Sequence, residues 1–190
     1  MAQVATNEFK TGMKVEIDGQ PFTIVTNEFV KPGKGQAFNR VKFKHLTNGR
    51  VLERNIKSGD KLDLADVVES TMRMLYREAD GVVFMDDNSF EQVTVNNDVT
   101  HDVNDWLMED LLYEIVFWNG QAVAVTPPTF MHLKIVETAP GARGDTVSGR
   151  VLKPATVQTG AQVQVPIFIE EGEVVKIDTR DGSYVCRSNE

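Results

Sequence analysis

The sequence has little of what several classes of protein depend on. It holds one cysteine, Cys186, which excludes an internal disulfide framework and a cysteine-built metal cluster. Its three histidines, His45, His101 and His132, stand far apart without the spacing of a metal site. No apolar run approaches the roughly 18 residues that a membrane helix needs, and the first 13 residues lack the apolar core of a signal peptide. We therefore expect a cytoplasmic protein that has no metal, no cofactor and no membrane partner.

Sequence motifs of common catalytic sites are also missing. The chain has no GxSxG elbow, no HExxH motif and no cysteine–histidine pair at a recognisable spacing. Paired carboxylates such as Asp86-Asp87, with Glu91 nearby, can do acid–base work. Because Asn88 follows the pair, the segment is more simply a turn. We predict that the protein is not an enzyme.

Charge is distributed unevenly along the chain. Residues 1–64 hold 11 Lys and Arg against 7 Asp and Glu, whereas residues 65–128 hold 2 against 13. The segment 31–50 carries six Lys and Arg and no acid, so it is the one sizeable basic concentration in the sequence. Binding surfaces are local, so this segment can meet nucleic acid although the net charge is −8. The acidic middle third is a spacer, a surface for a basic partner, or simply a solvated face.

Alternation of apolar and polar residues with a period of two dominates the sequence. Val15 and Ile17, then Phe22 and Ile24, alternate around a tight-turn dipeptide. Turn dipeptides of this kind recur throughout the chain: Asp18-Gly19, Asn48-Gly49, Asp80-Gly81, Asn119-Gly120 and Asp181-Gly182. Many short strands with frequent turns predict an all-β protein made of small barrels or sandwiches.

One stretch, residues 102–112, has apolar residues at helical spacing. Asp102 or Asn104 can cap its first turn, so we expect a helix there. Trp106, Trp118 and the phenylalanines are expected in the core.

Two boundaries divide the chain into three units. The charge changes sign near residue 65, after the turn-rich segment 57–60, and Pro127-Pro128 stiffens a second link. The predicted domains are 1–64, 65–126 and 127–190. Each has about 60 residues, near the lower limit for independent folding.

A glycine-rich loop joins two predicted strands of the first unit: Lys31, Pro32, Gly33, Lys34, Gly35 and Gln36. Pro32 fixes its own φ and favours extended conformations before it, while the two glycines remove side-chain bulk around Lys34. We expect a thin projecting loop with one long cation at its tip. It is not a phosphate-binding P-loop, because GxxxxGK[ST] is absent; a glycine-flanked lysine can also be an ordinary turn residue.

The following strand suggests a nucleic-acid surface. Alternation places Phe38, Arg40, Lys42 and Lys44 on one face. A basic stripe beside an aromatic ring can follow a phosphate backbone. The same pattern also fits a core phenylalanine beside solvated cations, so both interpretations stay open on spacing alone.

Four motifs in chain order resemble the bacterial elongation factor P family, which is related to the archaeal and eukaryotic initiation factor five-A. KPGKGQAF at 31–38 is similar to the family's tip loop. Segments 118–128 and 140–146 also resemble the family, including Gly144-Asp145-Thr146. A C-terminal segment of the chain resembles the family's C-terminal signature. It consists of Lys153-Pro154-Ala155, Gly160, Val163, Val165-Pro166, Ile169 and Gly172. The resemblance covers essentially the whole chain.

The resemblance implies an L-shaped arrangement of three β-barrels: an N-terminal SH3-like (KOW-type) barrel followed by two OB-fold barrels. It implies binding to both subunits of the ribosome between the P and E sites, beside peptidyl-tRNA, and relief of stalling at consecutive prolines. The implied partners are the ribosome, P-site peptidyl-tRNA and a modifying ligase. The protein itself is expected to be a monomer.

The family pattern also implies roles for individual residues. Lys34 would be extended with β-lysine by a ligase that resembles lysyl-tRNA synthetase, with hydroxylation as a further possibility, and would reach the CCA end. Contacts with tRNA and ribosome are expected from the other loop residues and the stripe: Lys31, Pro32, Gly33, Gly35, Gln36, Arg40, Lys42 and Lys44. Gly144, Asp145 and Thr146 would approach the small subunit and the E-site codon.

Two alternative functions stay open. One is a general single-stranded RNA or tRNA binder built from OB-folds, although the middle third has only Arg73 and Arg77 as cations. The other is a diverged paralogue of the factor that keeps the fold and serves other mRNAs.

Overall fold

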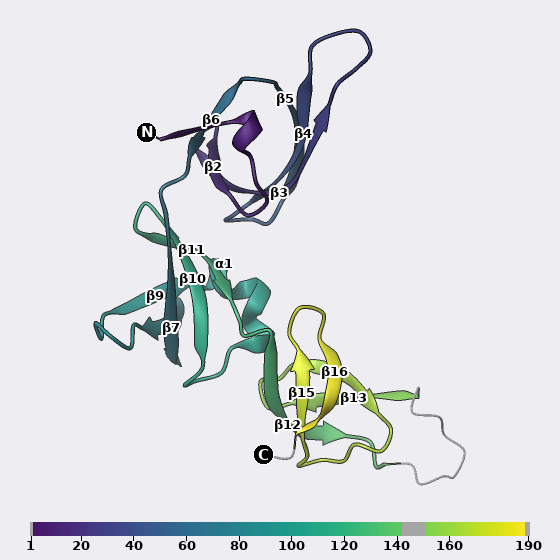
Figure 1. Cartoon of the computed structure of the whole chain (residues 1–190). Helices are drawn as coiled ribbons and strands as arrows, with labels where there is room; N and C mark the ends of the chain where they lie inside the picture. Colours follow the sequence, from purple (N-terminus) through teal and green to yellow (C-terminus); the bar gives the residue numbers. More distant parts are fainter. Residues whose placement is uncertain (1, 142–150, 189–190) are drawn as a thin grey trace. The chain divides into compact units, whose positions relative to one another are not determined.

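The computed structural model of the chain describes residues 2–141 and 151–188 (Figure 1). Strands dominate the described part, and its helices are short, with at most six residues each. The predicted all-β class is therefore confirmed. No helix among the described residues has the length and apolar character to cross a membrane.

The N-terminal strands form a six-stranded sheet in the order β1-β6-β2-β3-β4-β5. They are β1 (Gln3–Ala5), β2 (Lys14–Ile17), β3 (Gln20–Val30), β4 (Phe38–His45), β5 (Val51–Lys57) and β6 (Lys61–Leu64), with the 3-10 turn η1 (Thr6–Glu8) after β1. Figure 1 shows this sheet curling round on itself. Its alternating apolar residues face inward and form one core: Val4, Phe9, Val15, Ile17, Phe22, Ile24, Val41 and Phe43.

A five-stranded sheet follows, in the order β11-β10-β7-β8-β9. Its strands are β7 (Val67–Arg77), β8 (Gly81–Met85), β9 (Gln92–Asn96), β10 (Leu112–Trp118) and β11 (Gln121–Thr126). The helix α1 (Asn97–Thr100) and the 3-10 helix η2 (His101–Trp106) connect β9 to β10.

The last five strands close into a barrel, β12-β13-β14-β16-β15. They are β12 (Phe130–Thr138), β13 (Leu152–Val157), β14 (Gln162–Pro166), β15 (Val174–Asp178) and β16 (Ser183–Ser188). Lys153 at the start of the C-terminal signature is buried (8% exposed) and donates a hydrogen bond to the backbone carbonyl of Ala139. A buried ammonium needs such a partner, so this lysine has a structural role in the barrel.

By contacts, the chain divides into two compact units, Met1–Ser70 with Ile115–Ala124 and Thr71–Glu114 with Val125–Glu190. The central sheet contributes strands to both. The predicted division at 1–64, 65–126 and 127–190 stays a prediction.

The helix predicted over 102–112 is wrong in its bounds, because only residues 102–106 of that span are helical. The helical turns span residues 97–106, and their cap is Asn96, whose side chain accepts the backbone N–H of Asp98 at 2.9 Å. The helical turns end at Leu107, which is extended, and a turn at residues 109–110 leads into β10. The buried hydroxyl of Tyr113 donates to the Trp106 carbonyl at 2.6 Å and accepts the Met108 N–H at 2.9 Å. Tertiary hydrogen bonds therefore replace the helical ones that the periodicity predicted.

The expectation that all phenylalanines are core residues is wrong. Phe29 (61% exposed) and Phe90 (71% exposed) are open to solvent, as are Phe130 and Phe168. Alternation of apolar and polar residues does not show where a strand continues past the chain that packs on it. Phe29 lies on such an uncovered part of β3.

Two of the five predicted turn dipeptides have positive φ at both residues, whereas in Asn48-Gly49 and Asp181-Gly182 only the glycine does. Asp18-Gly19 and Asn119-Gly120 have positive φ at both residues, as the predicted hairpin turns require. Gly81 instead begins β8 with an ordinary φ, and a Cβ there would lie 2.4 Å from the carbonyl oxygen of Val95. This glycine is required by the close approach of β9 and not by a turn.

Candidate functional site

The loop between β3 and β4 projects from the N-terminal sheet (Figure 1). The two strands pair as far as Val30 and Phe38, and residues 31–37 connect them without regular structure. Lys31 and Lys34 are exposed, and Pro32 is half-buried. Gly35 has a φ of +114°, a conformation that side chains rarely adopt. The loop thus presents a lysine to solvent on a glycine-flanked backbone, as predicted from its sequence.

The side-chain amides of Asn39, which is buried, and Asn27, which is half-buried, join the base of this hairpin to the chain before β2. Asn39 on β4 is 5% exposed, and its Nδ2 donates to Oδ1 of Asn27 at 2.7 Å and to the carbonyl of Thr6 at 3.4 Å. Asn27 in turn donates to the carbonyl of Phe9 at 3.1 Å. Buried, satisfied polar groups of this kind hold one geometry. The chain segment before β2 therefore closes the inner face of the hairpin and fixes the direction in which the loop projects.

The basic stripe lies on the outer face of β4. Residues Asn39, Val41 and Phe43 are buried, while Arg40, Lys42 and Lys44 between them are exposed. The alternation predicted for this strand is confirmed. Phe38 lies at the end of the stripe and is half-buried.

Two carboxylates from neighbouring strands lie against the stripe. Arg40 approaches Glu28 on β3 at 3.8 Å and Glu53 on β5 at 3.9 Å, and Lys42 approaches the same Glu53 at 3.9 Å. All four side chains stay between 46% and 68% exposed, so these ion pairs are loose and solvated. Together with Thr26 and Asn27 these side chains line a shallow hollow of about 360 Å³. The cations closest to the middle of the sheet are partly neutralised before any partner arrives.

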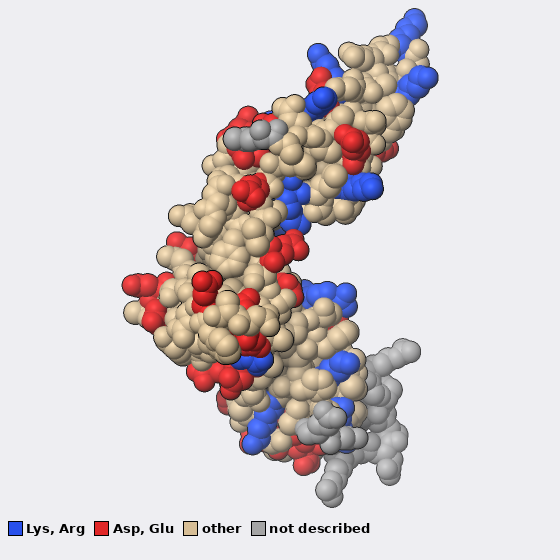
Figure 2. All heavy atoms as spheres, turned by 60° about the vertical axis from the view of Figure 1, so that its left-hand side comes forward, with Lys and Arg blue, Asp and Glu red and all other residues tan. Residues whose placement is uncertain are grey.

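The remaining cations of the basic segment have fewer carboxylates near them. Within residues 2–141 and 151–188, no ion pair joins Lys31, Lys34 or Lys44 to a carboxylate. Figure 2 shows Lys and Arg side chains at the projecting end of this sheet and Asp and Glu side chains over the central one. The structure thus keeps unpaired positive charge at both ends of the stripe.

His45, at the end of β4, has a structural environment. Its ring packs edge-on against Phe22, with 4.7 Å between the centroids, and its Nδ1 accepts the backbone N–H of Thr47 at 3.1 Å. Burial, with a smaller contribution from the charge of Arg50, lowers the pKa of His45 below its ordinary value. These surroundings thus favour the neutral form of the ring.

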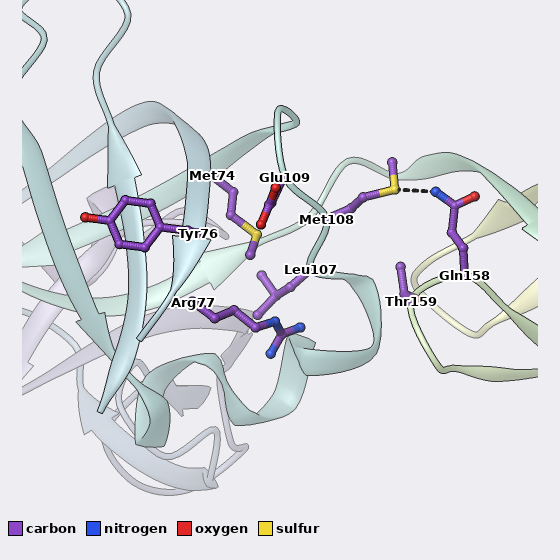
Figure 3. A pocket seen from close by; sticks show the side chains of 8 residues that line it. All are labelled: Met74, Tyr76, Arg77, Leu107, Met108, Glu109, Gln158 and Thr159. Carbon is purple, nitrogen blue, oxygen red and sulfur yellow. Dashed lines mark hydrogen bonds between the residues drawn. The ribbon is translucent and has the colours of Figure 1, made fainter. Parts of the chain in front are cut away.

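A second hollow, of about 460 Å³, lies in the unit that contains residues 71–114 and 125–190 (Figure 3). Its lining residues are Met74, Tyr76, Arg77, Leu107, Met108, Glu109, Gln158 and Thr159. The guanidinium of Arg77 is bound to the side chain of Asn104 at 2.5 Å and to its carbonyl at 3.2 Å. Gln158 donates from Nε2 to the Met108 sulfur at 2.8 Å. Arg77 and Gln158 thus have partners, whereas the buried hydroxyl of Thr159 has none among the described residues. None of the predicted site residues that the structure describes lines this hollow.

The other predicted residues have separate outcomes. Gly144, Asp145 and Thr146 lie outside the described residues. Asp86 binds the backbone N–H groups of Asn88 and Ser89 at 2.8 Å each, which lowers the pKa of its carboxyl and makes the segment a turn. In the described parts of the chain, no group of three or more His, Cys, Asp or Glu side chains is placed to hold a metal ion.

Sequence reasoning missed Glu28, Glu53 and Phe29. The two glutamates belong to the site because strand register places them opposite Arg40 and Lys42. Phe29 is directly opposite Asn39 on the inner face of the hairpin. No signal within 31–50 could reveal these neighbours, since they come from flanking strands.

Comparison with protein families identifies three segments of the chain. Residues 5–62 match the elongation factor P KOW-like domain, residues 67–125 match the elongation factor P OB domain, and residues 131–187 match the elongation factor P C-terminal family. The chain belongs to the elongation factor P family. The resemblance expected from the four motifs is thereby confirmed, and the family's KOW-like and OB domains are β-barrel folds.

Individual relatives of the family are similar over nearly their full length. "Elongation factor P 2" of Protochlamydia amoebophila is 60% identical over 187 residues, which cover 98% of each chain. The protein of the same name from Chlamydia pneumoniae is 57% identical over the same shares. Among solved structures, eukaryotic translation initiation factor 5A from Methanococcus jannaschii is 25% identical, with a TM-score of 0.55, over 66% of this chain and 92% of that one. The chain is thus a translation elongation factor of this family.

Proposed function

We propose that this elongation factor binds the ribosome between the P and E sites, beside peptidyl-tRNA, and promotes peptide-bond formation at consecutive prolines. The observation that supports this most is Lys34 at the tip of an exposed loop on a fastened hairpin, in a chain of this family. Loop residues Lys31, Pro32, Gly33, Gly35 and Gln36 would surround the CCA end of the tRNA. The factor would act in the cytoplasm as a monomer, without a cofactor.

The mechanism is positioning and not chemistry by the protein. Proline's ring restricts its backbone, so a productive geometry for attack is rarely reached. A factor that holds peptidyl-tRNA in that geometry lowers the barrier without a catalytic acid or base, and each 1.4 kcal/mol is about tenfold in rate. The exposed Lys34 and its thin loop are suited to reach into a narrow site, because the two glycines add no side-chain bulk beside it. On this proposal, the protein is not an enzyme.

Lys34 would carry β-lysine, attached by a ligase that resembles lysyl-tRNA synthetase, and hydroxylation could follow. An amide at Nζ removes one cationic amine and adds two, so the tip gains reach, hydrogen-bond donors and charge. Loop exposure supports access for such a ligase. Peptide mass spectrometry of natively purified protein tests this: an unmodified Lys34 would contradict it.

Docking would rest on the stripe of Arg40, Lys42 and Lys44 against the acceptor arm, as phosphate contacts by exposed cations. Gly144, Asp145 and Thr146 would approach the small subunit and the E-site codon. The chain would be divided functionally at 1–64, 65–126 and 127–190, with the acidic middle segment avoiding general attachment to RNA.

Synthesis of a three-proline peptide in a reconstituted translation system tests the proposal. The arms are no factor, natively purified protein, Lys34→Ala, and Lys61→Ala as an exposed lysine on β6 away from the loop. Rescue by the native and Lys61→Ala proteins, but not by Lys34→Ala, is expected. Equal rescue by Lys34→Ala would remove the tip mechanism.

A diverged paralogue is the second candidate, because the similar relatives are named "Elongation factor P 2". It predicts rescue at stalling sequences other than three prolines in the same assay. Binding to free RNA without binding to ribosomes would instead favour the general RNA binder.

A further inference from the structure

Phe29 differs from the other phenylalanines of the N-terminal sheet. Phe9, Phe22 and Phe43 are buried and Phe38 is half-buried, whereas Phe29 is 61% exposed. A single exposed apolar side chain is common on protein surfaces and by itself indicates nothing. The position of Phe29 in the hairpin is what suggests a function for it.

The Phe29 ring lies on the inner face of the projecting hairpin, just beyond the part of that face that the chain before β2 covers. Residues directly opposite in an antiparallel pair share a face, and Phe29 is opposite Asn39, which is buried under the carbonyl of Thr6. The covering chain contacts Asn27 on β3, two residues before Phe29, and Asn39 on β4, but it leaves Phe29 itself exposed. The ring is therefore uncovered, while the strand that carries it is held rigidly at its base.

The charged surroundings favour a nucleic acid as the occupant. Arg40 and Glu28 pair on the opposite face of the same two strands, and the loop beyond Phe29 carries Lys31 and Lys34 without an acid. Phosphates are attracted to such a loop. A phenylalanine ring has no hydrogen-bonding group, so what it offers to a neighbouring base is a stacking surface.

We propose that Phe29 is a stacking platform for an unpaired RNA base, and that this contact helps to position the tip loop. The inference rests on the proposed function for its setting, since the RNA would be that of the ribosome or of the tRNA bound to it. The phosphates of the same strand would lie near Lys31. Stacking holds a base by its face, so it tolerates any base and adds orientation without a sequence requirement.

The test compares aromatic and aliphatic side chains of similar size. Phe29→Leu and Phe29→Trp are measured for binding to purified bacterial ribosomes that carry P-site tRNA, over a series of salt concentrations. Val51→Ala is the matched control, because Val51 is 60% exposed on β5 of the same sheet and pairs with Lys44, at the end of β4 away from the loop. Three-proline synthesis at limiting factor is measured for the same proteins.

Loss of stacking is expected to weaken binding of Phe29→Leu about tenfold, with the slope of log affinity against log salt unchanged, because no cation is removed. Phe29→Trp should bind at least as tightly as the parent, and its tryptophan emission should change on binding more than that of the parent. Val51→Ala should behave as the parent does. Synthesis at limiting factor should fall with binding and recover at saturating factor.

Three results would overturn the proposal. Parent-like binding by Phe29→Leu would show that the ring is not used. Weak binding by both Phe29→Leu and Phe29→Trp would indicate a shape-specific protein pocket instead of a base. A change in the salt slope of Phe29→Leu would indicate an altered loop. Failure of the proposed function looks different, since then the parent protein itself neither binds the ribosomes nor rescues synthesis.

Discussion

Replacing Glu53 by glutamine should strengthen ribosome binding. The carboxylate lies 3.9 Å from both Arg40 and Lys42, so it offsets the charge of two cations that would otherwise face phosphate. Each ion pair is solvated and contributes at most about 1 kcal/mol to stability. The Glu53→Gln variant is therefore expected to fold normally, with a small loss in the free energy of unfolding.

The gain in binding follows from counterion release. Each phosphate that a free cation neutralises steepens the slope of log affinity against log salt by about 0.7 to 0.9. Freeing charge on Arg40 and Lys42 should steepen the slope by about one unit, and tighten binding roughly threefold to tenfold at low salt. Above about 0.3 M salt the variant and parent should converge, because screening removes the difference.

The assay is equilibrium binding of labelled protein to purified ribosomes over a salt series. Glu78→Gln is the control, because Glu78 is an exposed carboxylate just after β7 and gives the same change in net charge. Binding by Glu53→Gln that is no tighter than by Glu78→Gln would refute the assignment of the stripe to phosphate. In the same series Lys44→Gln should lower the slope more than Arg40→Gln, since Arg40 is already paired.

Three further predictions concern stability. The pKa of His45 is below its ordinary value in the folded state, so the unfolded chain binds more protons below about pH 6.5. The free energy of unfolding should therefore fall there as the pH drops. Urea titrations should show a smaller fall in His45→Gln, and an equal fall would contradict this. Phe90 has a φ of +58°, so Phe90→Gly should raise the melting temperature by a few degrees, corresponding to about 1 kcal/mol of relieved strain, and a lower melting temperature would exclude that strain. Gly81→Ala places its Cβ 2.4 Å from the Val95 carbonyl oxygen and should lower the free energy of unfolding, measured by calorimetry, by about 3 kcal/mol. Gly33→Ala, with open space around it, should lower it by less than about 1 kcal/mol. Equal losses would rule out the clash.

Local features of the site could be read from the sequence. Alternation along 38–45 is a property of the extended backbone, so exposure of Arg40, Lys42 and Lys44 follows from the residue pattern once the strand is recognised. The projecting loop follows from Pro32 and the glycines around Lys34 in the same way. Helical periodicity over 102–112 failed, because Tyr113 takes the backbone groups of Trp106 and Met108 for its own hydrogen bonds.

Register is what the sequence could not show. A β-bulge in β3 between Ile24 and Thr26 shifts the pairing with β4 by one residue. Without that shift, unbroken alternation from Ile24 would bring Glu28 opposite Asn39 and put Phe29 on the outer face. The bulge instead places Glu28 against Arg40 and turns Phe29 to the inner face.

The all-β class, the exposed tip lysine and the basic strand could each be predicted from local sequence, because each depends on neighbours a few residues apart. The folded structure was needed to show that Glu28 and Glu53 partly neutralise the stripe and that Phe29 is left uncovered beside the loop. These depend on which residues of separate strands meet. Pairing across strands is set by the bulge, by the buried Asn27–Asn39 contact and by the core beneath them, and none of these can be read from a local pattern.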